Sequence, residues 1–259
     1  ILFTHDMHDN MYPFKLLENG ETREVGGFAY LYSAIKKERK RDSELLLVDA
    51  GDFSMGTLFQ TIFTTDSPEL RMLGRMGYDV TTFGNHEFDF RTAGLAESLR
   101  SAKDSNDPLP EIVASNVEFP VDEKGKMNEE VKQLKEAMEY YGVKEYTIVE
   151  KKGIKIGIFG LMGKKADSYA PLALVEFTDQ IERAKEMVRV LQEEGAELIV
   201  CLSHSGTSDN KDESEDEILA KEVPEIDVII SGHTHTTLEE PIIVGDTVIG
   251  SVGYRGVNL

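Results

Sequence analysis

The chain of 259 residues carries 28 Lys and Arg against 48 Asp and Glu, which gives a formal net charge of −20 at pH 7. This acidity argues against a nucleic-acid polymer as partner, because binding to a phosphate backbone needs clustered Lys and Arg. No segment approaches the ~20 consecutive apolar residues of a membrane-spanning helix, so we expect none. A single cysteine, Cys201, excludes an internal disulfide and a thiolate zinc site, and its apolar surroundings predict an inert core thiol.

Five short apolar runs, each followed directly by polar residues, predict buried strands that end in loops. These runs lie at 1–3, 45–48, 80–83, 198–202 and 228–230. Strands of this kind deliver side chains to a site at their carboxyl ends. A later segment, 242–250, contains a Gly-Asp turn and predicts a β-hairpin.

Helical patterns separate the predicted strands. Apolar residues recur at helical spacing over 27–40 and over 178–194. A capping-box pattern at 214–217 predicts the start of a short helix before Pro224. The alternation of strands and helices, with 40% hydrophobic residues for a core, predicts an α/β domain.

Two charge-rich stretches, 121–141 and 205–217, are predicted to be surface insertions. Within the second, residues 209–217 contain six acidic side chains and one Lys. We interpret this run as a solvated loop in preference to a third cation site.

Residues of the types that bind metal ions follow the predicted strands. They are Asp6, His8, Asp52, Asn85, His86, His204, His233 and His235. Imidazole nitrogens with carboxylate or amide oxygens, converging from separate strand ends, form sites for Zn, Mn or Fe. Asp6 and His8 are two positions apart, which predicts that both lie on one side of an extended segment, and His233 and His235 repeat this spacing.

Each of these residues has a plainer explanation when taken alone. His204 is explained as a loop residue, Asp52 as a turn residue, and Asn85 or Asp89 as a helix cap. Five of the six histidines nevertheless come directly after predicted buried strands, which structural histidines have no reason to do. Together they indicate one site.

The order of these motifs resembles the calcineurin-like metallophosphoesterase superfamily. The motifs are Asp-x-His at 6–8, Gly-Asp at 51–52, Gly-Asn-His-Glu at 84–87, His204 at a strand end and Gly-His-x-His at 232–235. Within the superfamily, residues 49–52, 84–89, 203–206 and 232–236 look like the 5′-nucleotidase/UDP-sugar hydrolase branch. The fold that this resemblance implies is a four-layer αββα sandwich of two mixed sheets flanked by helices.

The resemblance also implies a ligand set for two divalent transition-metal ions, with Mn or Zn favoured and Fe, Co or Ni compatible. One ion is expected to take Asp6, His8 and His235, and the other Asn85, His204 and His233, with Asp52 bridging both. Asn85 and His86 are expected to contact the substrate. His86 is further expected to assist catalysis, oriented by Asp89.

Three positions near these motifs stay open in the sequence. His5 and Asp9 replace the Asn and Gly that the family pattern commonly has there, which leaves the surroundings of the first metal undetermined. His5 is predicted to point away from Asp6 and to be structural or substrate-facing instead of a ligand. Glu87 is interpreted as either a hydrogen-bond acceptor behind the ligands or a helix-start residue.

The function implied is metal-dependent hydrolysis of a small phosphate ester, with a 5′-nucleotide as the first candidate. Two alternatives are a cyclic-nucleotide or nucleotide-sugar phosphodiesterase and, outside the enzymes, a metal-retaining binding module with little turnover. We expect residues 1–259 to form the catalytic domain, without the family's C-terminal nucleoside-binding domain. By the same resemblance, we expect an extracytoplasmic location.

Overall fold

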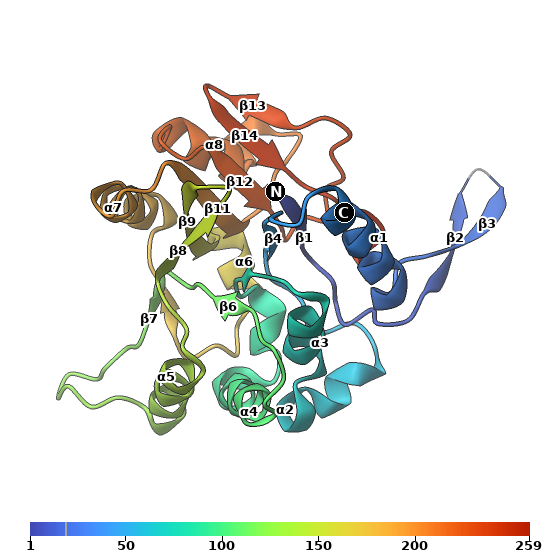
Figure 1. Cartoon of the computed structure of the whole chain (residues 1–259). Helices are drawn as coiled ribbons and strands as arrows, with labels where there is room; N and C mark the ends of the chain where they lie inside the picture. Colours follow the sequence, from blue (N-terminus) through green and yellow to red (C-terminus); the bar gives the residue numbers. More distant parts are fainter. Residues whose placement is uncertain (19) are drawn as a thin grey trace.

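Two larger sheets form the middle of the molecule (Figure 1). The structure is a computed structural model that describes residues 1–18 and 20–259. The four-stranded sheet is parallel, in the order β1 (Leu2–Thr4), β4 (Leu47–Asp49), β5 (Val80–Thr81) and β6 (Glu111–Ile112). The six-stranded sheet has the order β13 (Ile242–Val244), β14 (Thr247–Gly250), β12 (Val228–Ser231), β11 (Leu198–His204), β9 (Ile154–Met162) and β8 (Tyr146–Lys151). Its edge strands β13 and β8 are antiparallel to their neighbours, so this sheet is mixed.

Helices cover the outer faces of both sheets (Figure 1). The helices of the described residues are α1 (Phe28–Arg41), α2 (Phe63–Asp66), α3 (Pro68–Met76), α4 (Arg91–Asp104), α5 (Glu129–Tyr141), α6 (Lys164–Ser168), α7 (Gln180–Glu193) and α8 (Glu215–Glu222). Short 3₁₀ turns are η1 (Leu58–Ile62), η2 (Asn85–Phe88) and η3 (Lys211–Glu213). Two further strand pairs join β2 (Phe14–Glu18) to β3 (Glu21–Val25) and β7 (Val117–Glu118) to β10 (Glu176–Phe177). None of the helices described here combines the length and apolar character needed to cross a membrane.

Three apolar layers hold the four layers of structure together. The middle one joins Val48 and Val80 of the smaller sheet to Ile158, Val200 and Leu202 of the larger sheet. The outer two pack the smaller sheet against α1, α3, α4 and α5, and the larger sheet against α7 and α8. This arrangement confirms the predicted αββα sandwich, although the smaller sheet is parallel and only the larger one is mixed.

Strand β11 illustrates how sequence alternation builds these layers. Ile199 and Cys201 face the helices, while Val200 and Leu202 face the other sheet, because successive side chains of a strand point to opposite faces. A strand buried on both faces is therefore apolar throughout, as the sequence suggested. Cys201 is fully buried, and burial raises the pKa of its thiol well above the ordinary value.

Most of the predicted elements are present. The helix predicted at 178–194 is α7, and Asp179 caps it by accepting hydrogen bonds of 3.0 Å from the backbone N–H groups of Ile181 and Glu182. The helix predicted at 27–40 is α1. The predicted hairpin is β13 and β14, with Gly245 in the left-handed region at its turn.

The prediction that 121–141 is a surface insertion is wrong for most of its length. Residues 129–141 form α5, which buries Val131, Leu134 and Tyr141. These apolar residues recur at helical spacing, so α5 is an amphipathic helix whose many charges lie on its outer face.

The prediction of a solvated loop at 209–217 holds for 209–213, which are exposed, and is wrong for the buried residues 214–216. Asp216 is fully buried, and its carboxylate accepts hydrogen bonds from the Ser203 hydroxyl and the Gly206 N–H at 2.5 and 3.1 Å. Helix α8 begins at Glu215 as expected, but the Ser214 hydroxyl donates to the Glu217 side chain instead of capping a backbone N–H. Part of this acidic run therefore belongs to the core, beside the end of β11.

Candidate metal centre

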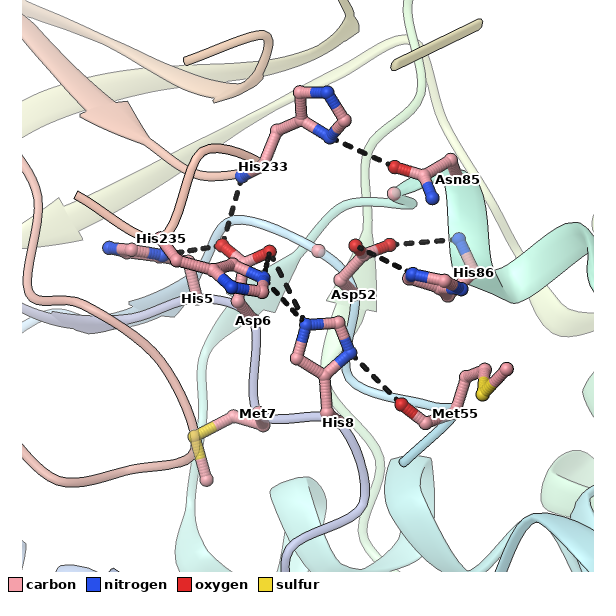
Figure 2. A network of polar contacts seen from close by, with 12 residues as sticks. His5, Asp6, Met7, His8, Asp52, Met55, Asn85, His86, His233 and His235 are labelled. Carbon is pink, nitrogen blue, oxygen red and sulfur yellow. Dashed lines mark hydrogen bonds and ion pairs between the residues drawn. The ribbon is translucent and has the colours of Figure 1, made fainter. Parts of the chain in front are cut away.

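The residues predicted as ligands converge at the carboxyl ends of five strands. Figure 2 shows those other than His204. They follow β1 (Asp6, His8), β4 (Asp52), β5 (Asn85) and β12 (His233, His235), and His204 ends β11. Because parallel strands of facing sheets end at the same edge of the sandwich, residues from distant parts of the chain meet there.

The loops that carry these residues are curled, not extended. Asp6 and His8 have φ values of 50° and 47°, and Asp52, His233 and His235 are also in the left-handed region at 52°, 70° and 54°. Such a backbone costs on the order of 1–3 kcal/mol for each non-glycine residue and persists only where neighbouring contacts hold it. The prediction that Asp6 and His8 share one side of an extended segment is wrong in mechanism, because backbone curvature brings them together.

A first cluster contains Asp6, His8 and His235. The Nε2 atoms of His235 and His8 lie 3.3 and 3.7 Å from Oδ1 of Asp6, and 2.9 Å from each other. Nδ1 of His8 lies 3.0 Å from the Met55 carbonyl oxygen, which can only accept, so the proton is on Nδ1 and the lone pair of Nε2 faces Asp6.

The two oxygens of Asp6 have different surroundings. Oδ2 receives hydrogen bonds from Nδ1 of His5 at 2.6 Å and from the backbone N–H of His233 at 2.9 Å. Oδ1 is buried and has no hydrogen-bond partner among the described residues. Burial disfavours the charged form, but the contacts with His235 and His5 outweigh it and lower the pKa of Asp6 well below its usual range. A buried, ionised oxygen facing two imidazole nitrogens is a donor group suited to a cation.

A second cluster contains Asp52, His204 and His233. Nε2 of His204 lies 3.1 Å from Oδ2 of Asp52, and its Nδ1 lies 2.8 Å from the Ala50 carbonyl oxygen. Nδ1 of His233 lies 3.0 Å from Oδ1 of Asn85, which adds an amide oxygen to this cluster. A third grouping places Asp52 with His8 and His86, so Asp52 adjoins both sets of histidines.

The electrostatics of the second cluster favour a positive charge beside Asp52. Burial disfavours ionisation of Asp52, yet the charge of His204 outweighs burial and lowers the pKa of this carboxyl. Burial alone would neutralise His204, but the charge of Asp52 raises its pKa to about 10. Burial and the charge of His204 lower the pKa of His233 to about 4. One carboxylate and two imidazoles, with the amide oxygen of Asn85 beside them, form a donor set that fits transition metals.

His86 and Asp89 form a pair beside the two clusters. Nδ1 of His86 lies 2.7 Å from Oδ2 of Asp89, and Nε2 lies 4.0 Å from Oδ2 of Asp52. Burial opposes the imidazolium, but the hydrogen bond with Asp89 and the charge of Asp52 outweigh it and raise the pKa of His86 to about 9. The His86 side chain is 32% exposed, so this imidazolium is open to a ligand.

Glu87 lies behind the proposed ligands. It is both a hydrogen-bond acceptor and a helix-start residue, the two interpretations that the sequence left open. Its carboxylate accepts from the backbone N–H groups of Asp52 and Ser54 at 3.0 Å, from the Ser54 hydroxyl at 2.8 Å and from the Gly84 N–H at 2.6 Å. The last contact closes the start of η2. Gly84 itself has no room for a side chain, because a Cβ would collide with Oδ1 of Asp52.

The prediction that His5 points away from Asp6 is wrong, whereas its expected structural role agrees with the contacts. His5 is buried, and its Nε2 accepts a hydrogen bond of 2.8 Å from the backbone N–H of Val252. Its Nδ1 therefore carries the proton and donates to Asp6.

Sequence reasoning missed Asp49, which ends β4. It is fully buried and accepts from the hydroxyls of Thr4 and Thr81 at 2.7 and 3.0 Å and from the Gly51 N–H at 3.1 Å. Burial raises its pKa to about 7. The signal in the sequence for Asp49 was its place as an acidic residue directly after an apolar run. Its contacts fix the loop that carries Asp52.

A sequence model of the family described as Calcineurin-like phosphoesterase matches residues 1–237. The chain belongs to this family, as its motifs predicted. It is 30% identical over 254 residues to a probable 5′-nucleotidase of Treponema pallidum, a match that covers 96% of this chain and 37% of that protein. It is 29% identical over 254 residues to a 2′,3′-cyclic-nucleotide 2′-phosphodiesterase/3′-nucleotidase of Haemophilus influenzae, covering 91% of this chain and 36% of that protein.

Among solved structures, the 5′-nucleotidase precursor from Thermus thermophilus is similar with a TM-score of 0.77 and 26% sequence identity. The match covers 98% of this chain and 48% of that structure. The chain thus spans little more than a third of the length of the two curated relatives and about half of this solved chain.

Proposed function

We propose that this chain is the catalytic domain of a phosphoesterase that hydrolyses 5′-nucleotides with two divalent transition-metal ions. The observation that carries the proposal is the pair of Asp/His clusters that adjoin at Asp52, next to the His86 and Asp89 pair. Asp6, His8 and His235 would hold one ion and Asn85, His204 and His233 the other, with Asp52 shared. Mn and Zn suit this mixture of nitrogen and oxygen donors, as do Fe, Co and Ni.

When bound there, the two ions would supply an activated water molecule and would offset the charge of the phosphoryl oxygens. The chain's own residues then supply orientation and a proton. Asn85 and His86 adjoin the clusters and would hold the phosphoryl group of the substrate. His86 would give its Nε2 proton to the alkoxide that leaves, and Asp89 would keep the ring oriented through Nδ1.

The charge of Asp89 matters more to His86 once Asp52 holds cations. Part of the raised pKa of His86 comes from Asp52, and bound cations would offset that part. Asp89 would remain as the group that keeps His86 protonated near neutral pH.

The nucleotide part of the proposal rests on the relatives. The Treponema protein is named a probable 5′-nucleotidase, which supports a 5′-monoester. The Haemophilus protein is named a cyclic-nucleotide phosphodiesterase and 3′-nucleotidase, which favours a cyclic diester as the second candidate. We propose that a nucleoside-binding domain outside residues 1–259 supports substrate choice, and that the protein acts outside the cytoplasm.

The test is phosphate release by chelator-treated protein reloaded with Mn²⁺ or Zn²⁺. Substrates are 5′-AMP and 2′,3′-cyclic AMP under identical metal conditions, compared in wild type, His204→Ala and Asp52→Asn. We expect faster turnover of the monoester and a loss of at least 100-fold in both variants, since each loses a proposed ligand. Equal rates in wild type and variants would refute the proposal, and Mn²⁺ binding without any hydrolysis would favour the binding module.

A further inference from the structure

Two of the four histidines in the two clusters have the ring nitrogen that faces away from the cluster fixed by a backbone carbonyl. Nδ1 of His8 faces the Met55 carbonyl and Nδ1 of His204 faces the Ala50 carbonyl. Nδ1 of His233 instead faces Oδ1 of Asn85, which belongs to the same cluster. For His235, only Nε2 has a polar contact among the described residues, and this nitrogen faces Asp6 and His8. The His235 side chain is 40% exposed, against 8% for His8 and none for His204.

The ring of His235 packs against an aromatic ring instead of a backbone carbonyl. The Tyr254 ring stacks on it with centroids 4.7 Å apart and planes within 10° of parallel. The guanidinium of Arg255 lies 5.1 Å from the centroid of the Tyr254 ring, which adds a cation–π contact. A planar neighbour at this distance limits rotation of the imidazole about its side-chain bonds.

The segment that presents Tyr254 is tied to both loops of the first cluster. The backbone N–H of Arg255 donates to the Asp6 carbonyl at 2.8 Å, and that of Gly253 donates to the Thr236 carbonyl at the same distance. Val252 donates to His5, which in turn holds Asp6. Tyr254 is therefore fixed relative to Asp6 and to Thr236, the residue that follows His235, as a positioning element must be.

We propose that Tyr254 is a positioning residue that orients the His235 imidazole for the metal ion shared with Asp6 and His8. The proposal rests on the metal-binding part of the proposed function. In the first cluster, Tyr254 does for His235 what a backbone carbonyl does for His8. Its flat ring is what matters, and its hydroxyl is dispensable.

Tyr169 provides a matched control. Its ring lies 5.6 Å from that of His233 and is tilted by 54°, so it does not stack on this imidazole. Tyr169 is 66% exposed and Tyr254 40%, so both substitutions remove an exposed tyrosine next to a proposed ligand. Only the loss of Tyr254 removes a ring stacked on a proposed ligand.

The experiment is calorimetric titration of Mn²⁺ into the metal-free full chain, for wild type and for Tyr254→Ala, Tyr254→Leu, Tyr254→Phe and Tyr169→Ala. We expect Tyr254→Ala and Tyr254→Leu to weaken one of two equivalents by about threefold to tenfold. Tyr254→Phe and Tyr169→Ala should stay within about twofold of wild type. Thermal unfolding of each metal-free variant checks the fold, and the leucine variant keeps the bulk of the side chain if alanine disturbs it.

Wild-type affinity in both Tyr254→Ala and Tyr254→Leu would overturn the inference, as would an equal loss in Tyr254→Phe, which would assign the effect to the hydroxyl. Phosphate release from 5′-AMP, measured on the same samples, separates the two proposals. Metal binding that depends on Tyr254 without hydrolysis supports the positioning role and rejects the proposed function. Hydrolysis with unchanged metal affinity in the variants supports the proposed function and rejects the positioning role.

Discussion

The imidazole of His5 donates a hydrogen bond of 2.6 Å to Oδ2 of Asp6, and this contact leaves Oδ1 of Asp6 free to face His8 and His235. The direction of the bond follows from the far side of the ring, where the Val252 N–H donates to Nε2. His5 thus orients Asp6, a proposed metal ligand, from the side of the carboxylate that faces away from the cluster.

His5→Ala should weaken binding of one Mn²⁺ by about 10–100-fold while both equivalents still bind at saturation, because the variant keeps Asp6 but loses its orientation. Calorimetric titration measures affinity and stoichiometry together. Ser251→Ala is the control, since its hydroxyl lies 3.2 Å from the far nitrogen of His5 and does not touch Asp6. Loss of a whole equivalent in His5→Ala would make His5 a ligand and contradict the prediction.

Asp89→Asn should shift the alkaline limb of the pH profile of kcat/KM toward lower pH. Asp89 helps to raise the pKa of His86 to about 9, above its ordinary value of 6.5, so the acid form is present below that pKa and lost as pH rises through it. The amide removes the negative charge and lowers that limit. For comparison, His86→Ala should reduce kcat by about 10²–10⁴-fold at unchanged metal content. A limb that stays in place in Asp89→Asn would show that another group sets it.

Glu87→Gln should lower the free energy of unfolding by about 1–3 kcal/mol. The amide oxygen can still accept from Asp52 and Gly84, but the amide NH₂ then faces Ser54, whose backbone N–H loses its acceptor. Urea denaturation measures the change. Glu97→Gln, on the exposed side of α4, should stay within about 0.5 kcal/mol of wild type. Equal stability of the two variants would mean that the buried hydrogen bonds of Glu87 contribute little.

Glu69→Gln should stabilise the protein at pH 8 more than at pH 5.5. Glu69 is buried in α3, and burial, reinforced by the charges of Asp9 and Glu87, raises its pKa from 4.5 to about 8. Between these values the folded chain holds a proton that the unfolded chain releases, so stability falls as pH rises through this window. The neutral amide removes that loss, which is on the order of a few kcal/mol.

The midpoint of urea denaturation at the two pH values checks this prediction, with Glu97→Gln again as the exposed control. A difference between Glu69→Gln and wild type that is the same at both pH values would contradict it.

The sequence by itself determined the α/β class and the set of residues at the centre. Apolar runs without alternation mark strands buried on both faces, and α7 is visible through its helical spacing. Polar residues directly after such strands had to meet, because parallel strands of facing sheets end at one edge.

Only the tertiary structure decided which charges are buried and how the ligands converge. Asp216 lies in a run of acids that reads as solvated, yet Ser203 and Gly206 enclose it, and α5 hides an apolar stripe among its charges. Asp6 and His8 meet through left-handed backbone that no local pattern encodes. Local sequence sets periodicity, whereas the burial of a charge and a strained φ angle depend on partners such as Val252 for His5, distant in the chain.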